Sequence, residues 1–107
     1  MNKKDLIADE IKTAALVLRA LNNKLRRDIL YLLDKHKKMN VTELFAALRI
    51  QQSQCSNQLR ILQENGIVKN ERVLKSRYYS IVPERLSYIN TMAKAIVNGT
   101  VNVDASV

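Results

Sequence analysis

A short stretch of mostly uncharged polar side chains, Gln51–Gln58, is the part of the sequence best suited to molecular recognition. Every residue in it except Cys55 carries an amide or a hydroxyl group. A helix that only had to be soluble would carry Glu and Lys here, because Ser and Asn lower helix stability. Short side chains that donate and accept hydrogen bonds suit the base edges of duplex DNA, where Asn and Gln bind adenine with two bonds. The stretch therefore predicts base contacts.

Positive charge accompanies this stretch. No acidic residue falls between Gln52 and Gln63, so nothing there repels phosphate. Further along, Lys and Arg outnumber the single acid Glu71, and a basic β-ribbon contacts phosphates or enters the minor groove. The net charge of +8 also favours an anionic partner. The predicted DNA-binding residues are Thr42, Gln52, Ser53, Gln54, Ser56, Asn57, Gln58, Arg60, Arg72, Lys75 and Arg77.

Hydrophobic periodicity places these residues on a series of short elements. Apolar residues recur at helical spacing over 5–21, 24–36, 41–48 and 52–65, and Gly66 ends the last of these helices. The period then changes to that of strands over 67–73 and 77–82, which are close enough to form a hairpin. Pro83 begins a final helix with apolar residues as far as Val97. Asn22–Asn23 is the predicted cap of the second helix, and Asn40 or Thr42 that of the third.

This order predicts a mainly α fold with a small β-hairpin, namely a winged helix-turn-helix. The third helix, a tight turn and the polar fourth helix form the helix-turn-helix, whose second element enters the major groove. The hairpin that follows is the wing. The 107 residues are predicted to form a single DNA-binding and dimerisation domain over 1–98 and a flexible tail over 99–107.

Several segments, in this order and spacing, make residues 20–84 resemble the ArsR-type winged-helix repressors of bacteria. They are Ala20–Leu30, Val41–Leu48, Gln52–Leu62, Gly66–Val68 and Tyr78–Ile81. The resemblance implies the same winged-helix fold, and a dimer built mainly from the first and last helices.

The chain departs from this family at positions that bear on its function. Arg49 stands where the family often has Gly, so we expect a strained turn before the polar helix. Gln51 replaces a common capping Ser, and Gln58 replaces a frequent His, so base preference does not transfer. The wing tip, 73–76, lacks the usual Gly and carries an unexplained apolar pair.

Both terminal helices carry wide apolar faces, which a domain of this size has too little core to bury alone. This agrees with the dimer that the resemblance implies. A two-fold dimer predicts an inverted-repeat DNA site with half-sites about one helical turn apart. The predicted interface residues are Ile7, Ile11, Leu18, Ile89, Met92 and Ile96.

Metal ligands are too few for a sensor site. One site known in the family uses two cysteines at the start of the third helix, where this chain has Asn40 and Thr42. Another uses Asp, His and Glu on the last helix, which has no His here. Zinc needs three or four N or S ligands, and the chain offers one His36 and one Cys55. We expect no metal and no cofactor, with His36 at a solvated helix end and Cys55 as a buried core thiol.

We expect a cytoplasmic protein that is not an enzyme. The single cysteine cannot form an intrachain disulfide, the N-terminus does not match a signal peptide, and no apolar run approaches the roughly 20 residues of a membrane span. No nucleophile–base pair or phosphate-binding glycine loop is present. The first hypothesis is a homodimeric, sequence-specific DNA-binding regulator, and the resemblance implies that it is a repressor. The alternatives are a regulator that responds to thiol oxidation or a small ligand, and a winged-helix module that binds protein.

Overall fold

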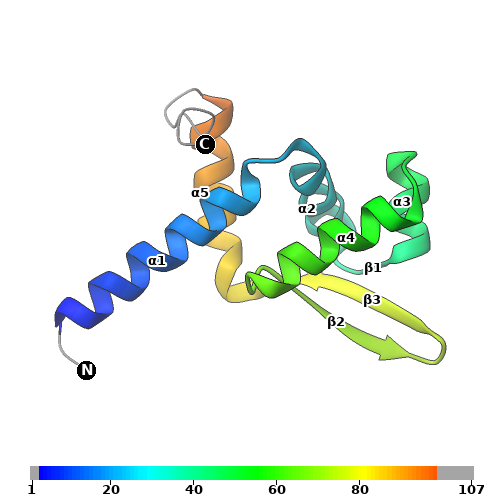
Figure 1. Cartoon of the computed structure of the whole chain (residues 1–107), viewed down its shortest axis with the longest axis horizontal. Helices are drawn as coiled ribbons and strands as arrows, with labels where there is room; N and C mark the ends of the chain where they lie inside the picture. The colour runs from blue at the N-terminus through cyan, green and yellow to red at the C-terminus, as the bar shows by residue number, and fades with distance from the viewer. Residues whose placement is uncertain (1–2, 99–107) are drawn as a thin grey trace.

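The computed structural model describes residues 3–98 of the chain as helices and short strands (Figure 1). The elements are α1 (Lys3–Leu21), α2 (Lys24–His36), β1 (Met39–Asn40), α3 (Val41–Leu48), α4 (Gln52–Glu64), β2 (Val68–Val73), β3 (Ser76–Ile81) and α5 (Pro83–Val97). This order confirms the predicted winged helix-turn-helix, and the predicted bounds agree to within two residues. The predicted flexible tail, 99–107, lies outside the described residues.

Polar caps fix the starts of α2 and α3. The Asn23 Oδ1 accepts a hydrogen bond of 3.0 Å from the backbone N–H of Arg26, as the sequence predicts for this position. At α3, the Asn40 Oδ1 accepts from the backbone N–H of Glu43 at 2.8 Å, and the Glu43 carboxylate accepts from the Asn40 N–H at 2.9 Å. This reciprocal pair is a capping box, so Asn40 rather than Thr42 caps the helix.

The ends of α3 and α4 share one hydrogen-bond pattern. A residue with left-handed backbone follows each helix: Arg49, with φ of 56°, and Gly66, with φ of 71°. The N–H of that residue and the N–H of the next donate to carbonyls three and five residues earlier, at 3.0 to 3.3 Å. Arg49 therefore occupies a position that favours glycine. The backbone strain that the sequence predicts for this turn lies at Arg49 itself.

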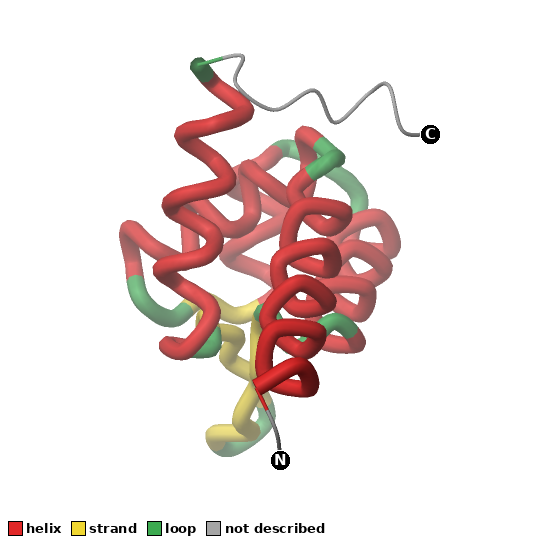
Figure 2. The backbone as a smooth tube through the Cα atoms, turned by 90° about the vertical axis from the view of Figure 1, so that its left-hand side faces the viewer, coloured by secondary structure: helices red, strands yellow, loops and turns green. Residues whose placement is uncertain are grey.

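The core lies where α1, α2, α3 and α4 meet the base of the sheet, and the wing projects from it (Figure 2). Cys55, Leu59 and Leu62 of α4 are fully buried, as their helical spacing predicts. The other core residues are Val17, Ala20, Leu21, Ile29, Leu30, Leu33, Met39, Leu44, Ile67, Val68 and Ile89.

The sheet holds one strand that the sequence did not predict. Its order is β1-β3-β2, and all pairs are antiparallel. The two-residue β1 pairs Met39 with Tyr79 and Asn40 with Tyr78. Because β1 directly precedes α3, this pairing attaches the base of the wing to the start of the helix-turn-helix. Two residues carry no periodicity, so the hydrophobic pattern gave no signal for this strand.

The predicted dimer residues fall in different environments. The first half of α1 extends away from the other helices, and Ile11 on it is 65% exposed (Figure 1). Leu18, Met92 and Ile96 are half-buried, the last two against the core of their own chain. Ile89 is only 6% exposed and belongs to that core, so its side chain is covered within one chain and its role at an interface stays a prediction. The side chain of Ile7 lies outside the described part of the structure.

Candidate nucleic-acid interface

The outer side of α4 is a continuous polar surface. Its members are all exposed, and we call them the polar face of α4: Gln52, Ser53, Gln54, Ser56, Asn57 and Arg60. The opposite side of the helix is fixed in the core by Cys55, Leu59 and Leu62. This division holds the polar side chains outward without a charged residue before Arg60. Such a face can present several hydrogen-bond donors and acceptors to one partner surface.

Some members of the polar face already make hydrogen bonds to residues three or four positions away in the chain. The Gln54 Oε1 accepts from the backbone N–H of Gln51 at 3.2 Å, which satisfies a donor at the helix start. The Arg60 guanidinium donates to the Asn57 Oδ1 at 2.7 Å and to the Glu64 carboxylate at 2.8 Å. These side chains are exposed, and exposed ion pairs contribute about 0–1 kcal/mol, so a bound phosphate can replace them at little cost.

Gln58 differs from its prediction, because it does not project with the polar face. It is half-buried, and its Oε1 accepts a hydrogen bond of 2.9 Å from the Arg26 guanidinium. Arg26 also donates to the backbone carbonyl of Ala20 at 2.7 Å. Burial lowers the pKa of Arg26 from its ordinary value, yet an arginine stays protonated in proteins. Gln58 therefore connects α4 to α2 and to the end of α1.

A polar groove of about 500 Å³ separates the polar face of α4 from the wing. Arg77 on β3 donates to the Asn70 Oδ1 at 2.8 Å, and Asn70 in turn donates to Gln63 of α4. These contacts hold the wing beside the helix. The groove has arginines on both walls, and it is lined by Ser56, Arg60, Gln63, Glu64, Asn70, Arg77 and Tyr79.

The wing also carries the predicted cations Arg72 and Lys75 near its tip. Arg72 and Arg77 are direct cross-strand partners in the β2–β3 register, and Lys75 lies in the two-residue turn. All three side chains are exposed. The Arg72 Nε donates to the Leu74 carbonyl at 3.2 Å, which leaves the rest of the guanidinium free of hydrogen bonds to residues 3–98. Thr42, on the first turn of α3, is also exposed.

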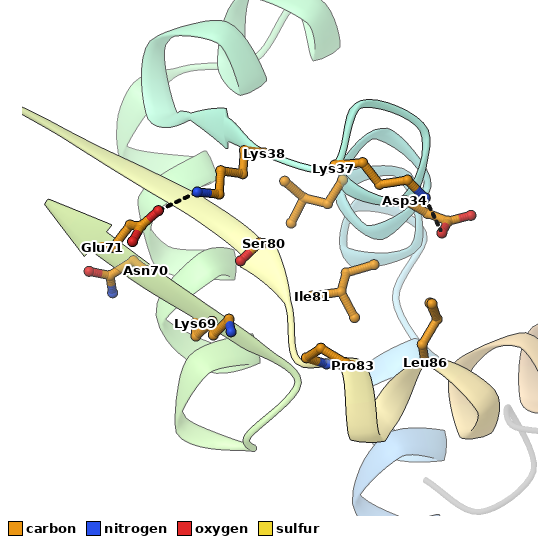
Figure 3. Close-up of a pocket in the computed structure, with 11 residues that line it drawn as sticks. Asp34, Lys37, Lys38, Lys69, Asn70, Glu71, Ser80, Ile81, Pro83 and Leu86 are labelled. Atoms are coloured by element: carbon orange, nitrogen blue, oxygen red, sulfur yellow. Dashed lines mark hydrogen bonds and ion pairs between the residues drawn. The ribbon is translucent and has the colours of Figure 1, made fainter. Parts of the chain in front are cut away.

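A second groove, of about 610 Å³, lies on the opposite side of the wing, between β2, the end of α2 and the start of α5 (Figure 3). Among its lining residues, Lys38 forms an ion pair with Glu71, and Lys37 pairs with Asp34 at 3.7 Å. The hydrogen bond and the charge of Lys38 lower the pKa of the Glu71 carboxyl. Its apolar lining residues are Leu33, Ile81, Pro83 and Leu86.

The two candidate metal ligands lie in different environments. Cys55 is fully buried, as predicted, and burial raises the pKa of its thiol to about 11. His36 is exposed in the last turn of α2, which agrees with its expected position at a solvated helix end. Over the described range 3–98, no three His, Cys, Asp or Glu side chains gather as metal ligands would. None of the helices in that range is long and apolar enough to cross a membrane.

Comparison of the sequence with known proteins identifies the family to which the chain belongs. Residues 23–70, from the start of α2 into the wing, match the family described as bacterial regulatory protein, arsR family. The arsenic resistance transcriptional regulator ArsR1 of Pseudomonas putida is 30% identical over 89 residues, which are 83% of this chain and 70% of that protein. The matched region therefore includes both the helix-turn-helix and the wing.

Solved structures agree with the sequence comparison. The transcriptional repressor PagR of Bacillus anthracis superposes with a TM-score of 0.70 at 28% identity, over 79% of this chain and 98% of PagR. The homodimeric winged helix-turn-helix DNA-binding domain Mb0332 of Mycobacterium bovis gives a TM-score of 0.72 at 25% identity, over 94% of this chain and 88% of that domain. The chain belongs to the ArsR family of bacterial regulatory proteins, and it is a transcriptional regulator with a DNA-binding winged helix-turn-helix, not an enzyme.

Proposed function

We propose that this chain is a repressor that binds an inverted-repeat DNA site as a homodimer. The observation that carries the proposal is the polar face of α4, joined by an arginine-walled groove to a basic wing. In this proposal Ser53, Gln54 and Asn57 contact base edges, with Gln52, Ser56 and Thr42 beside them. Arg60, Arg72, Lys75 and Arg77 neutralise phosphates. Gln58 is left out of the base-reading set because it is half-buried and accepts a hydrogen bond from Arg26 of α2, whereas Gln54 and Asn57 are exposed.

The dimer is supported by the exposed apolar surface of α1 and by a related structure. Ile11 is 65% exposed on a helix that extends away from its own domain (Figure 1). The related Mb0332 domain is homodimeric, and PagR is a repressor. Two copies joined through α1 and α5 would present two polar faces of α4 to one duplex. A two-fold dimer reads half-sites about one helical turn apart, which is why the site is proposed to be an inverted repeat.

Base reading is tested by selecting bound sequences from a random duplex pool and then measuring Asn57→Ala on the preferred duplex. The variant should lose about 1–3 kcal/mol of binding free energy there and much less on random DNA. Asn90→Ala, an exposed asparagine of α5, is the matched control and should bind as the unmodified chain does. Equal losses of Asn57→Ala on both kinds of DNA would contradict a base-reading role.

Phosphate binding is tested by the salt dependence of affinity. Each phosphate contact adds about −0.9 to the slope of log K against log salt, so Arg77→Gln in both protomers should flatten the slope by about 1.8. Lys94→Gln on the last turn of α5 removes the same charge far from the groove and should leave the slope unchanged. If no duplex is bound at low salt, the chain acts through protein contacts, and DNA repression is wrong for it.

Response to a small ligand is a second candidate function, and the groove beneath Lys38 and Glu71 favours it (Figure 3). Its volume falls within the range of small-molecule sites. Its lysines and apolar inner wall suit a carboxylate with a hydrocarbon body. Octanoate is a suitable probe: methyl NMR shifts at Ile81 and Leu86, together with a change in DNA affinity, would support this function. Unchanged spectra at millimolar octanoate would count against it.

Arsenic response is not proposed, although the relative from Pseudomonas putida is an arsenic resistance regulator. Soft metal and metalloid ions are held by several thiolates. This chain has one cysteine, and that thiol is buried with a raised pKa.

A further inference from the structure

The tip of the wing carries an exposed apolar pair that the fold does not use. Leu74 is 90% exposed and Val73 is 47% exposed, and neither packs against the core. A single exposed leucine is ordinary on a protein surface. The backbone and the neighbours of Leu74 make this one unusual.

Leu74 has a left-handed backbone, with φ of 59°. It is the first of the two turn residues between Val73 and Ser76, which pair across the hairpin. A positive φ at this position belongs to the turns that close two-residue hairpins, and glycine is favoured there because it has no Cβ. A leucine in this place strains the turn and gains no buried contact in return. The stability of the hairpin therefore gives no reason for a leucine.

Basic residues neighbour the exposed leucine in the hairpin. Arg72 and Arg77 lie opposite each other across the hairpin, and Lys75 follows Leu74 directly. Like charges in direct cross-strand positions destabilise a hairpin unless a counter-charge lies between them. The nearest acid on the wing, Glu71, is already paired with Lys38 on the other side of the strand. The tip is thus an exposed leucine next to Arg72 and Lys75, with Arg77 further back beside Asn70, and this combination complements a polyanion with an apolar interior.

We propose that Leu74 is a wedge, which the wing inserts into the minor groove beside the half-site bound by α4. The proposal rests on the DNA binding proposed above and adds a residue that reads the flank of the site. Proteins that bind the minor groove insert Leu, Phe or Ile between base steps, while Arg and Lys neutralise the phosphates on either side. A strand of six residues spans about 20 Å, close to the roughly 17 Å that separate a major groove from the next minor groove.

A wedge makes binding depend on how easily the flanking base step opens. Pyrimidine–purine steps, TA above all, unstack more readily than G·C-rich steps. Leu74 is therefore expected to favour TA steps in the flank, at positions where no hydrogen bond reads a base. Such a preference would belong to the leucine side chain and not to the charges around it.

The test compares the full chain with Leu74→Gly in parallel selections from one pool of random duplexes. Glycine fits the left-handed turn, so the variant should melt no lower than the unmodified chain. The unmodified chain should enrich TA steps at the flanks, and the variant should not. On the best TA-flanked duplex the variant should bind about tenfold more weakly or worse, because a buried leucine is lost, with an unchanged salt slope. On a duplex with G·C flanks the two should differ little.

Lys75→Gln is the matched control, since it alters the adjacent charge and leaves the wedge. It should flatten the salt slope and keep the preference for TA flanks. A 2-aminopurine placed in the flanking step adds a direct signal: its fluorescence should rise when the unmodified chain binds, and stay low with Leu74→Gly.

Each other outcome has a definite meaning. Equal affinity of the two proteins on TA flanks, or an equal loss on both flanks with silent 2-aminopurine, overturns the wedge and leaves the proposed function standing. A lower melting temperature of Leu74→Gly would assign the leucine a role in the fold, and Leu74→Asn, which also tolerates the left-handed turn, then repeats the binding comparison. Failure of the unmodified chain to bind any duplex removes the proposed function, and the wedge with it.

Discussion

Replacing Arg49 by glycine should raise the stability of the domain. The Arg49 backbone is left-handed, with φ of 56°, and its exposed guanidinium makes no hydrogen bond to the described residues. A residue with a Cβ costs roughly 1–2 kcal/mol in this conformation, and glycine removes that cost. Glycine also gives the unfolded chain more conformational freedom, and this lowers the free energy of unfolding by about 0.5–1 kcal/mol. The net gain is about 0.5–1 kcal/mol in the free energy of unfolding, or about 2–8 °C in Tm.

Urea unfolding followed by circular dichroism measures this gain. Ala47→Gly is the matched control, because Ala47 is exposed and helical two residues earlier, and glycine there should lower stability by about 1 kcal/mol. The two substitutions introduce the same residue and should have opposite signs. A loss of stability in Arg49→Gly would refute the reasoning, since it would mean that the arginine side chain contributes more than its backbone strain costs.

Three further predictions concern the dimer, the thiol and metals. Ile11→Asp should give a folded monomer by light scattering, because Ile11 is 65% exposed. Ile89→Asp should lose its cooperative thermal transition, because Ile89 is only 6% exposed, and a folded Ile89→Asp monomer would contradict this. Cys55 should not react with a disulfide reagent at pH 8 unless urea is added, because with a pKa of about 11 only about one thiol in a thousand is ionised; prompt reaction of the folded chain would reopen the thiol-sensing alternative. DNA affinity should change by less than tenfold, about 1.4 kcal/mol, between chelator-treated protein and protein given stoichiometric zinc, cadmium or arsenite; a larger loss that chelator reverses would make the chain a metal sensor.

Elements that depend on local pattern could be predicted from the sequence. The bounds of α2, the cap at Asn23 and the burial of Cys55, Leu59 and Leu62 all follow from periodicity and capping chemistry within one or two helical turns. The left-handed turn at Arg49 was also within reach, because the resemblance places a glycine there. These features are set by neighbours in the chain, which a single sequence displays.

Features that depend on distant partners could not be predicted. Ile89 has the same helical spacing as Met92 and Ile96, so periodicity alone cannot tell that Ile89 is buried in the core of its own chain while the other two remain half-buried. β1 exists because Met39 and Asn40 meet β3 about forty positions later. A two-residue strand has no period of its own, and its pairing depends on how the whole wing is positioned.

Gln58 shows most clearly why residue type alone does not define a site. As an amide within a polar helix it is chemically suited to a base, although its spacing of three residues from Cys55 and four from Leu62 places it nearer the apolar stripe than Gln54 is. Its hydrogen bond with Arg26 commits it instead to a contact that spans 32 positions of the chain. Arg26 also binds the Ala20 carbonyl at the end of α1, where backbone acceptors lack helical partners. One guanidinium thus joins the helix proposed for dimerisation to the helix proposed for base contact. Since charge-assisted hydrogen bonds are short and directional, these contacts hold the Gln58 side chain toward α2 and the end of α1. An amide that its residue type assigns to DNA contact is therefore held by a contact within the protein, and that contact becomes visible only once α2 and α4 are placed side by side.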